Sequence, residues 1–340
     1  MRDHATAQPL DYAIECSKIA RSLGIVFQPL PEGCIEGRIL RLGGFSGLFN
    51  QIFVSTQCNV FHTKLVYTRL VRFAGAKIGV FDSGFGGLTV LKALLEFVPD
   101  AEYLYFGDTA RLPYGSKSVE TVARYACEAA QYLEQQGAEL LVIACNTATA
   151  LAFEQIKNSA SVEVVGVIEP GAERAAASSR SGKVVVIGTE ATTCSHAYRH
   201  ALAARQIEAH EKACPLLVPL VEEGWVNHPV TEEIARIYLN EAFSDAFRSA
   251  DVLLLGCTHY PLLRPVLQRV APPGVTLVDS AESTALAVRE LLSSNSGNAS
   301  DAKKDRVRFF VTDSVEKFRR LGRLFLGQDI SNITHVDLKE

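Results

Sequence analysis

The feature that most restricts the fold is an alternation of short apolar runs with longer amphipathic segments, which begins at Lys77. The amphipathic segments predict helices, and strands that alternate with helices pair in parallel. The sequence therefore predicts an α/β fold built from doubly wound parallel sheets. The strands are expected at residues 77–81, 102–106, 140–144, 162–168, 183–187, 216–220, 251–255, 276–278 and 306–311, and the helices include residues 88–97, 118–136, 193–204, 230–247, 283–293 and 314–326.

Two of the apolar runs end in the same way. Residues 140–144 lead into Cys145, and residues 252–256 lead into Cys257, with small polar residues after each cysteine. The carboxyl end of a strand is where open α/β sheets place their ligands. Lys77 and Lys183 open similar runs 68 and 74 residues before these cysteines. This faint repeat predicts two similar domains related by a pseudo-twofold axis, with the active site between them.

The repeat also suggests domain boundaries. We expect one domain to comprise residues 77–168 and 280–340, and the other to comprise the inserted residues 169–279. Residues 1–76 lack the strand–helix alternation and carry 8 basic against 5 acidic residues, whereas the remainder carries 26 against 33. We interpret this extension as a poorly ordered appendage or as translated sequence upstream of the true start, with a short amphipathic helix fitting residues 12–23.

Composition narrows the class of protein. The net charge is −4, so the global balance predicts neither a nucleic-acid nor an anionic-membrane partner. No apolar run approaches the ~20 residues of a membrane span, and the first residues do not resemble a secretory signal. Eight cysteines in 340 residues are too few for a disulfide scaffold. We therefore expect a cytoplasmic protein with free thiols.

The cysteines allow several interpretations. A free cysteine is most often a small buried apolar residue, and this interpretation is given to Cys127, Cys194 and Cys214. Zinc is an alternative for Cys145, Cys257 and His259, although no fourth ligand is evident. A Cys–His hydrolase is another, but it would need only one thiol.

Two thiols on opposite domains fit inversion at a carbon atom. One base removes the α-proton from one face, and a conjugate acid delivers a proton to the other. A thiol suits both tasks because its pKa of about 8.5 can be tuned towards the working pH. Asp82, which opens a glycine-rich turn after the first strand, and His259 could assist the two thiols.

Four motifs together resemble the bacterial glutamate racemases. They are residues 77–87 (KIGVFDSGFGG), 107–115 (GDTARLPYG), 145–148 (CNTA) and 256–261 (GCTHYP). The wider aspartate/glutamate racemase superfamily shares the two cysteines but not all of these flanking residues. The resemblance extends over residues 77–292. It implies cofactor-independent interconversion of L- and D-glutamate, which supplies D-glutamate for peptidoglycan synthesis, cell wall biogenesis and cell shape.

The resemblance also implies roles for individual residues. Cys145 would be the base toward D-glutamate and Cys257 the base toward L-glutamate. Asp82 would assist Cys145, and His259 would assist Cys257. The remaining acids implied are Glu222, with its neighbour Glu223 as the alternative, and Asp108. The residues implied to surround the substrate are Asp82, Ser83, Pro113, Tyr114, Gly115, Ser116, Asn146, Thr147, Thr189, Thr192, Thr258 and His259.

The partner expected from the resemblance is a small molecule, glutamate, with no cofactor, metal, nucleic acid or membrane, and with a homodimer as one option for assembly. A racemase of the same superfamily that acts on aspartate or another amino acid is the competing enzyme. A third hypothesis is an interaction module whose binding element is the extension 1–76.

Overall fold

The computed structural model describes residues 75–293 and 306–338, together with three strands near the N-terminus. It divides into two units, Met1–Arg72 and Phe73–Glu340. In the first unit, β1 (Ile25–Phe27), β2 (Arg38–Leu42) and β3 (Gln51–Val54) form an antiparallel sheet in the order β1-β2-β3. No strands were predicted here, because the sequence of an antiparallel sheet lacks the strand–helix alternation that indicates a parallel one. The helix suggested at 12–23 lies outside the described residues.

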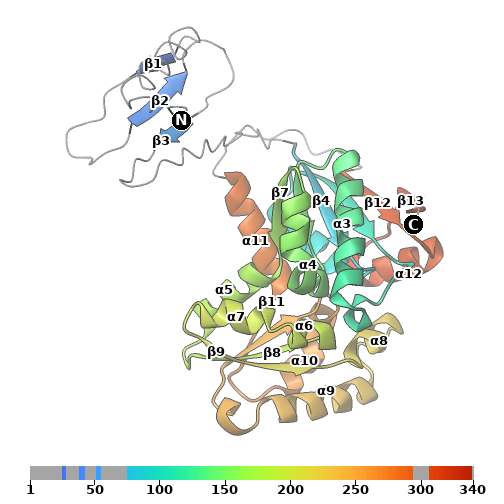
Figure 1. Cartoon of the computed structure of the whole chain (residues 1–340). Coiled ribbons are helices and arrows are strands. Elements are labelled where there is room, and N and C mark those ends of the chain that lie inside the picture. Colours follow the sequence, from blue (N-terminus) through green and yellow to red (C-terminus); the bar gives the residue numbers. More distant parts are fainter. Residues whose placement is uncertain (1–24, 28–37, 43–50, 55–74, 294–305, 339–340) are drawn as a thin grey trace, which may run out of the picture. The chain divides into compact units, whose positions relative to one another are not determined.

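The second unit contains two sheets (Figure 1). The first has six parallel strands in the order β13-β12-β5-β4-β6-β7. Its central strands are apolar and buried on both faces, as expected for a covered parallel sheet. The strands are β4 (Lys77–Asp82), β5 (Glu102–Gly107), β6 (Leu140–Ile143), β7 (Glu163–Gly166), β12 (Val307–Val311) and β13 (Ile333–His335).

Helices cover both faces of this sheet. On one face, α3 (Val119–Gln135) and α4 (Asn146–Ser159) contribute to a buried cluster with Phe81 of β4. On the other face, α2 (Leu88–Phe97) and α12 (Val315–Leu326) pack in the cluster that contains Ile78 and Val80 of the same strand. Alternate side chains of one strand therefore supply two cores.

The second sheet has four parallel strands in the order β11-β10-β8-β9. These are β8 (Lys183–Gly188), β9 (Glu208–Ala213), β10 (Val252–Gly256) and β11 (Thr276–Asp279). One face packs against α5 (Ile168–Ser178) and α7 (Ala197–Ala203), and the other against α8 (Leu217–Glu222), α9 (Pro229–Ala242) and α10 (Arg264–Val270). The other α-helices of the described residues are α6 (Glu190–Cys194) and α11 (Ser280–Ser293).

This architecture confirms the predicted α/β class with two parallel sheets. β7 belongs to the first sheet, whereas β8 and β11 belong to the second. The domain boundaries at 168/169 and 279/280 stay a prediction.

One predicted strand is wrong. Residues 216–220 do not form a strand, because Leu217–Glu222 is the helix α8. Its buried residues, Leu217 and Val221, are four positions apart, so one helical face accounts for their burial. The strand of this region is β9, which begins at Glu208 and whose sequence EAHEKA is too polar to be recognised. β9 lies at the edge of its sheet, where polar side chains are tolerated.

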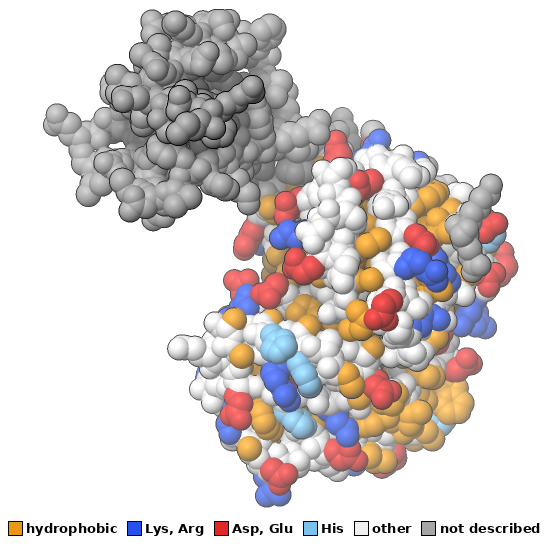
Figure 2. Space-filling view, in the orientation of Figure 1, with side chains coloured by type: hydrophobic (Ala, Val, Ile, Leu, Met, Phe, Trp, Pro, Cys, Tyr) orange, Lys and Arg blue, Asp and Glu red, His pale blue; other side chains and the backbone are white. Residues whose placement is uncertain are grey.

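Within the described ranges, no helix is both long and apolar enough to cross a membrane. Basic and acidic side chains are interspersed over the described part of the face shown in Figure 2. The predicted site residues lie where strands of the two sheets end.

Candidate active site

A cavity of about 220 Å³ lies where strand ends from both sheets meet. Cys145 follows β6 of the first sheet, and Cys257 follows β10 of the second, and both line this cavity. The other predicted residues that line it are Ser83, Pro113, Tyr114, Gly115, Ser116, Asn146, Thr147, Thr189, Glu222, Thr258 and His259. The cavity thus contains the duplicated cysteine turns and most of the predicted surroundings.

Cys145 is a buried thiol at the N-terminus of a helix. It is the N-cap of α4, and its Sγ accepts a hydrogen bond from the Ala148 backbone N–H at 3.4 Å. The thiol donates to Ser83 Oγ at 3.5 Å. Burial, and secondly the charge of Asp82, raise the pKa of Cys145 to about 12. At neutral pH the free site therefore holds Cys145 as the thiol, which is the form that can donate a proton.

Asp82 lies at the end of β4, behind the cavity wall. One carboxylate oxygen, Oδ2, accepts from the Gly84 backbone N–H at 2.9 Å. The other, Oδ1, is buried and has no hydrogen-bond partner among the described residues. Burial raises the pKa of Asp82, although the charge of His259 and backbone hydrogen bonds oppose this rise. Such an acid can influence the Cys145 thiol by charge without contacting a ligand in the cavity.

Cys257 begins a chain of polar contacts. Its Sγ lies 3.9 Å from His259 Nδ1, and His259 Nε2 lies 3.3 Å from Glu222 Oε1. Burial lowers the pKa of His259, but hydrogen bonds to Cys257 and Glu222 outweigh it and raise the pKa to about 10. The structure thus places Glu222 at His259, whereas the adjacent Glu223 is exposed at the end of α8.

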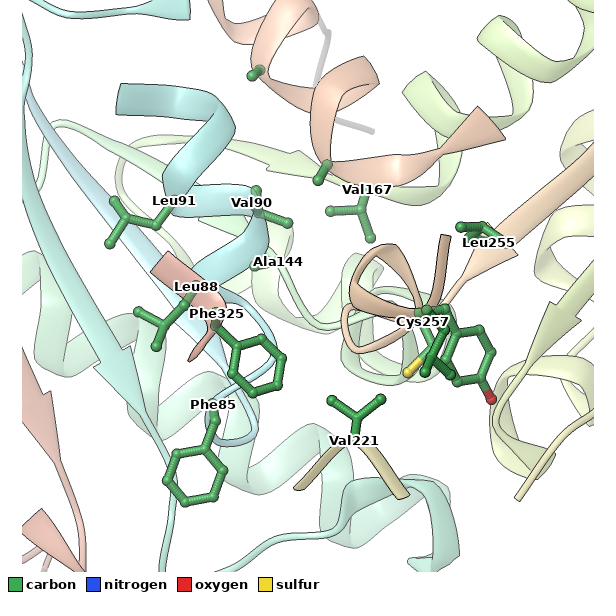
Figure 3. Packing of buried hydrophobic residues seen from close by; sticks show 14 of the residues in the cluster. Phe85, Leu88, Val90, Leu91, Ala144, Val167, Val221, Leu255, Cys257 and Phe325 are labelled. Atoms are coloured by element: carbon green, nitrogen blue, oxygen red, sulfur yellow. The ribbon is translucent and has the colours of Figure 1, made fainter. Parts of the chain in front are cut away.

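Glu222 is stabilised as a carboxylate. Burial alone would raise its pKa, but His259 and Lys317 together hold it below the ordinary value. Apolar side chains surround the turn that contains Cys257, because Cys257 belongs to a buried cluster with Val221, Leu255 and Phe325 (Figure 3). The charged groups of Glu222 and His259 therefore interact more strongly among these apolar side chains than they would in water.

The glycine-rich turn after β4 packs directly on the Cys257 turn. A Cβ atom added at Gly86 would lie 2.2 Å from Thr258 Oγ1 and 2.5 Å from His259 Nδ1. Thr89 Oγ1 is within 3.0 Å of the carbonyl oxygens of both Gly86 and Thr258. Only a residue without a side chain allows this approach, so the turn joins the ends of the two sheets at the cavity.

Threonine hydroxyls also connect helices that follow strands of the two sheets. Thr147 Oγ1 lies 2.9 Å from Thr189 Oγ1 and 3.2 Å from Thr192 Oγ1, and Thr189 and Thr192 are 2.9 Å apart. Thr147 and Thr189 line the cavity, whereas Thr192 does not line it and contacts both of them through its hydroxyl group. Asn146 is held similarly, because its side-chain oxygen accepts from the Tyr198 hydroxyl at 2.6 Å.

Asp108 was expected at the site, but it does not line the cavity. Its carboxylate pairs with Arg111 at 2.8 Å and accepts from the hydroxyls of Tyr114 at 2.5 Å and Thr312 at 2.9 Å. Tyr114 does line the cavity. The geometry therefore gives Asp108 an indirect place, in which it holds Tyr114.

Some lining residues were missed by the sequence analysis. Gly84 and Phe85 belong to the glycine-rich motif and could have been chosen with Ser83. Glu190 directly follows the predicted Thr189, and Leu112 precedes the predicted Pro113. The others, Pro215, Val218 and Pro219, lie in or before α8, so the wrong strand at 216–220 concealed them.

Three further cysteines of the described residues differ in their burial. Cys214 is buried, as predicted, and Cys127 is half-buried, but Cys194 is exposed on α6, so its assignment to the core is wrong. Within residues 75–293 and 306–338, no group of three His, Cys, Asp or Glu side chains is arranged to hold a metal ion.

The family follows from comparison with known proteins. The family model described as Asp/Glu/Hydantoin racemase matches residues 78–288. The chain belongs to this racemase family. A curated glutamate racemase from Koribacter versatilis is 58% identical over 282 residues, which cover 77% of this chain and 97% of that relative.

Solved structures agree with the assignment. Glutamate racemase from Francisella tularensis, in complex with D-glutamate, is 34% identical with a TM-score of 0.71, covering 78% of this chain and 98% of the other. Glutamate racemase from Thermus thermophilus, in complex with beta-chloro-D-alanine, is 46% identical with a TM-score of 0.69 and the same coverage. These relatives confirm the predicted fold class and the prediction that the chain is an amino-acid racemase.

Proposed function

We propose that this chain interconverts L- and D-glutamate by proton transfer between two cysteines, without a cofactor. The observation that carries the proposal is that Cys145 and Cys257, which follow equivalent strands of two sheets, line one cavity. The substrate is inferred from the relatives, whose name is glutamate racemase at up to 58% identity.

In the direction from L- to D-glutamate, the Cys257 thiolate removes the α-proton and becomes a thiol. The electron pair stays on the α-carbon as a planar carbanion. The Cys145 thiol then donates its proton to the opposite face and becomes a thiolate. Exchange of one proton with solvent restores the starting state. The reverse direction uses Cys145 as the base.

The environments of the two thiols suit these starting roles. Cys145, whose pKa is raised to about 12, rests protonated and ready to donate. His259, whose pKa is raised to about 10, carries a positive charge at neutral pH within 3.9 Å of the Cys257 sulfur. A cation beside a sulfur atom stabilises the thiolate. L-glutamate therefore reacts with the state in which Cys257 is the thiolate and Cys145 the thiol, and D-glutamate reacts with the opposite state.

The α-proton must also be made acidic by the site. Asn146 and Thr147 form the first turn of α4, whose N-terminus opens into the cavity. Backbone N–H groups and the helix dipole at such an end stabilise a carboxylate and the negative charge that develops beside it. We assign to this end the carboxylate next to the reacting carbon, with Ser83, Thr189 and Thr258 as further donors.

Asp82 and Asp108 act through other residues. Asp82 influences the Cys145 thiol by its charge. Asp108 fixes Tyr114, which lines the cavity. In the cell, the product would supply D-glutamate for peptidoglycan, in keeping with the resemblance noted in the sequence. The homodimer stays a prediction.

The test compares glutamate with aspartate as substrates of the purified full chain, using circular dichroism to follow loss of optical activity. We expect a much higher kcat/KM for glutamate than for aspartate. Cys145→Ala and Cys257→Ala should each abolish racemisation, whereas Cys194→Ala, which removes an exposed thiol on α6, should leave it unchanged. Faster turnover of aspartate would overturn the substrate, and activity in either of the first two variants would overturn the mechanism.

A further inference from the structure

The inner face of the C-terminal helix α12 contacts the Cys257 half of the site at two places. Lys317 Nζ lies 3.2 Å from Glu222 Oε2, although the two residues are 95 positions apart in the chain. Two turns along the helix, the Phe325 ring meets the His259 ring edge-on, with centroids 5.3 Å apart. The helix α12, which packs with the first sheet, therefore contacts Glu222 and His259, which lie next to the second sheet.

Lys317 is held in place on a second side as well. Its ammonium lies 5.1 Å from the centroid of the Phe85 ring, which lines the cavity. Lys317 itself does not line the cavity, so it does not touch a bound substrate. Its ammonium group contacts Glu222 from outside the cavity.

The two oxygens of Glu222 have different partners. Oε1 lies 3.3 Å from His259 Nε2, and Oε2 lies 3.2 Å from Lys317 Nζ. The Glu222 side chain is only 15% exposed. A carboxylate that is held at both oxygens cannot rotate away from either partner without losing a charge-assisted hydrogen bond.

We propose that Lys317 is a positioning residue for proton transfer at Cys257. Lys317 holds Oε2 of Glu222, so that Oε1 can accept a hydrogen bond from His259 Nε2. This contact fixes the imidazole ring with Nδ1 towards the Cys257 sulfur. Orienting an imidazole through its second nitrogen is a general way to set which nitrogen carries the proton. The inference rests on the proposed function and deepens it, because it makes one thiol, not both, depend on the C-terminal helix.

This one-sidedness has a kinetic signature. The two enantiomers of glutamate have equal free energies, so any variant must lose kcat/KM equally in both directions. The asymmetry appears instead in primary isotope effects. If the Cys257 step becomes slower, removal of deuterium from [2-²H]-L-glutamate limits the rate more, and its isotope effect rises. The isotope effect with [2-²H]-D-glutamate falls, because Cys145 then removes the label in a step that no longer limits the rate.

The variant is Lys317→Met, which keeps the length of the side chain and removes its charge. We expect kcat/KM to fall roughly tenfold, a fraction of the 10²- to 10⁴-fold that a positioned acid or base contributes. The isotope effect should rise for L-glutamate and fall for D-glutamate. Lys317→Arg should restore most of the rate. Arg320→Met, which removes an exposed charge from the same helix, should change neither quantity.

A second measurement does not depend on turnover. In ¹⁵N-histidine NMR spectra of the full chain, the His259 pKa should fall by about one unit in Lys317→Met, because Glu222 is then no longer held against the imidazolium, and a neighbouring carboxylate commonly accounts for shifts of this size or more. Loss of the lysine charge alone would act in the opposite direction and raise the His259 pKa. The charged and titratable groups that act on His259 are Cys257, Glu222 on α8, Asp82 at the end of β4 and, through Glu222, Lys317.

The outcomes separate the two proposals. If the wild type does not racemise glutamate, the proposed function fails, and the NMR titration alone decides the role of Lys317. An unchanged or raised His259 pKa in Lys317→Met would overturn that role. So would a loss of kcat/KM in which both isotope effects stay as in the wild type, because that result indicates general loss of structure and not a slower Cys257 step.

Discussion

Replacing Gly86 by alanine would insert a methyl group between the two turns that meet at the cavity. The new Cβ would lie 2.2 Å from Thr258 Oγ1 and 2.5 Å from His259 Nδ1. Ordinary contacts of a Cβ atom begin at 3.4 Å, so one turn must retreat by about 1 Å. The His259 ring would then move relative to Cys257, whose sulfur is 3.9 Å from Nδ1 in the wild type.

Two magnitudes follow from this displacement. Overpacking of a close-packed site costs about 1–3 kcal/mol of the free energy of unfolding. A misplacement of about 1 Å in a catalytic group can cost about 100-fold in rate. We therefore expect Gly86→Ala to fold, to lose about 1–3 kcal/mol of stability and to lose about 100-fold in kcat/KM for glutamate.

The assays are urea unfolding, followed by circular dichroism, and racemisation of each enantiomer. The matched control is Gly79→Ala, whose Cβ would lie 2.8 Å from Leu141 Cδ2, against α3 and away from the cavity. It should cost similar stability and less than about threefold in kcat/KM. Full activity in Gly86→Ala, or equal loss of activity in both variants, would refute the argument that this contact positions His259.

Three further predictions concern buried charges and pH. Arg111→Met should lower the free energy of unfolding by about 3–5 kcal/mol in urea titrations, because it leaves the fully buried Asp108 without its cation. Asp82→Asn should lower the pKa of Cys145 by about one unit and so speed its alkylation about tenfold at pH 8, measured by peptide mass spectrometry. Wild-type stability should fall as the pH rises from about 9 towards 12, because the folded Cys145 keeps a proton that the unfolded chain loses, and Cys145→Ala should show a shallower fall.

Each of these predictions has a control or a contrary outcome. Arg269→Met breaks a more exposed ion pair, with Glu232, and should cost no more than about 1 kcal/mol. Equal losses in the two arginine variants would contradict the importance of the buried pair. Unchanged alkylation in Asp82→Asn would mean that Asp82 is uncharged in the free enzyme. Equal pH slopes in the wild type and Cys145→Ala would show that burial does not raise the Cys145 pKa.

Strands whose residues are buried on both faces could be predicted directly from the sequence. β6 and β10 consist of apolar residues alone, apart from the final Gly256, so the positions of Cys145 and Cys257 at strand ends followed from the sequence. β9 lies at an edge and is polar, and α8 is short and apolar. A short apolar run does not distinguish a strand from a helix, and this ambiguity produced the wrong strand.

The site was predictable only where its residues lie in recognisable motifs. The Cys257–His259 contact joins neighbours in the chain, and Glu222 was chosen by resemblance. Lys317 gave no such signal, because one lysine on an amphipathic helix resembles any other. Its contact with Glu222 depends on how a helix of the C-terminal segment packs against α8 and the turn that contains His259, and no local pattern encodes that packing.

The central claim is that two thiols act on opposite faces of one carbon. Its most direct test is to incubate the full chain with L-glutamate in heavy water and to follow optical activity and α-deuteration together. We predict that the D-glutamate formed early in the reaction carries one deuterium at the α-carbon, delivered by Cys145, while the remaining L-glutamate stays largely unlabelled. D-glutamate that retains the original α-hydrogen would show that one group carries the proton between faces, and would contradict the two-thiol mechanism.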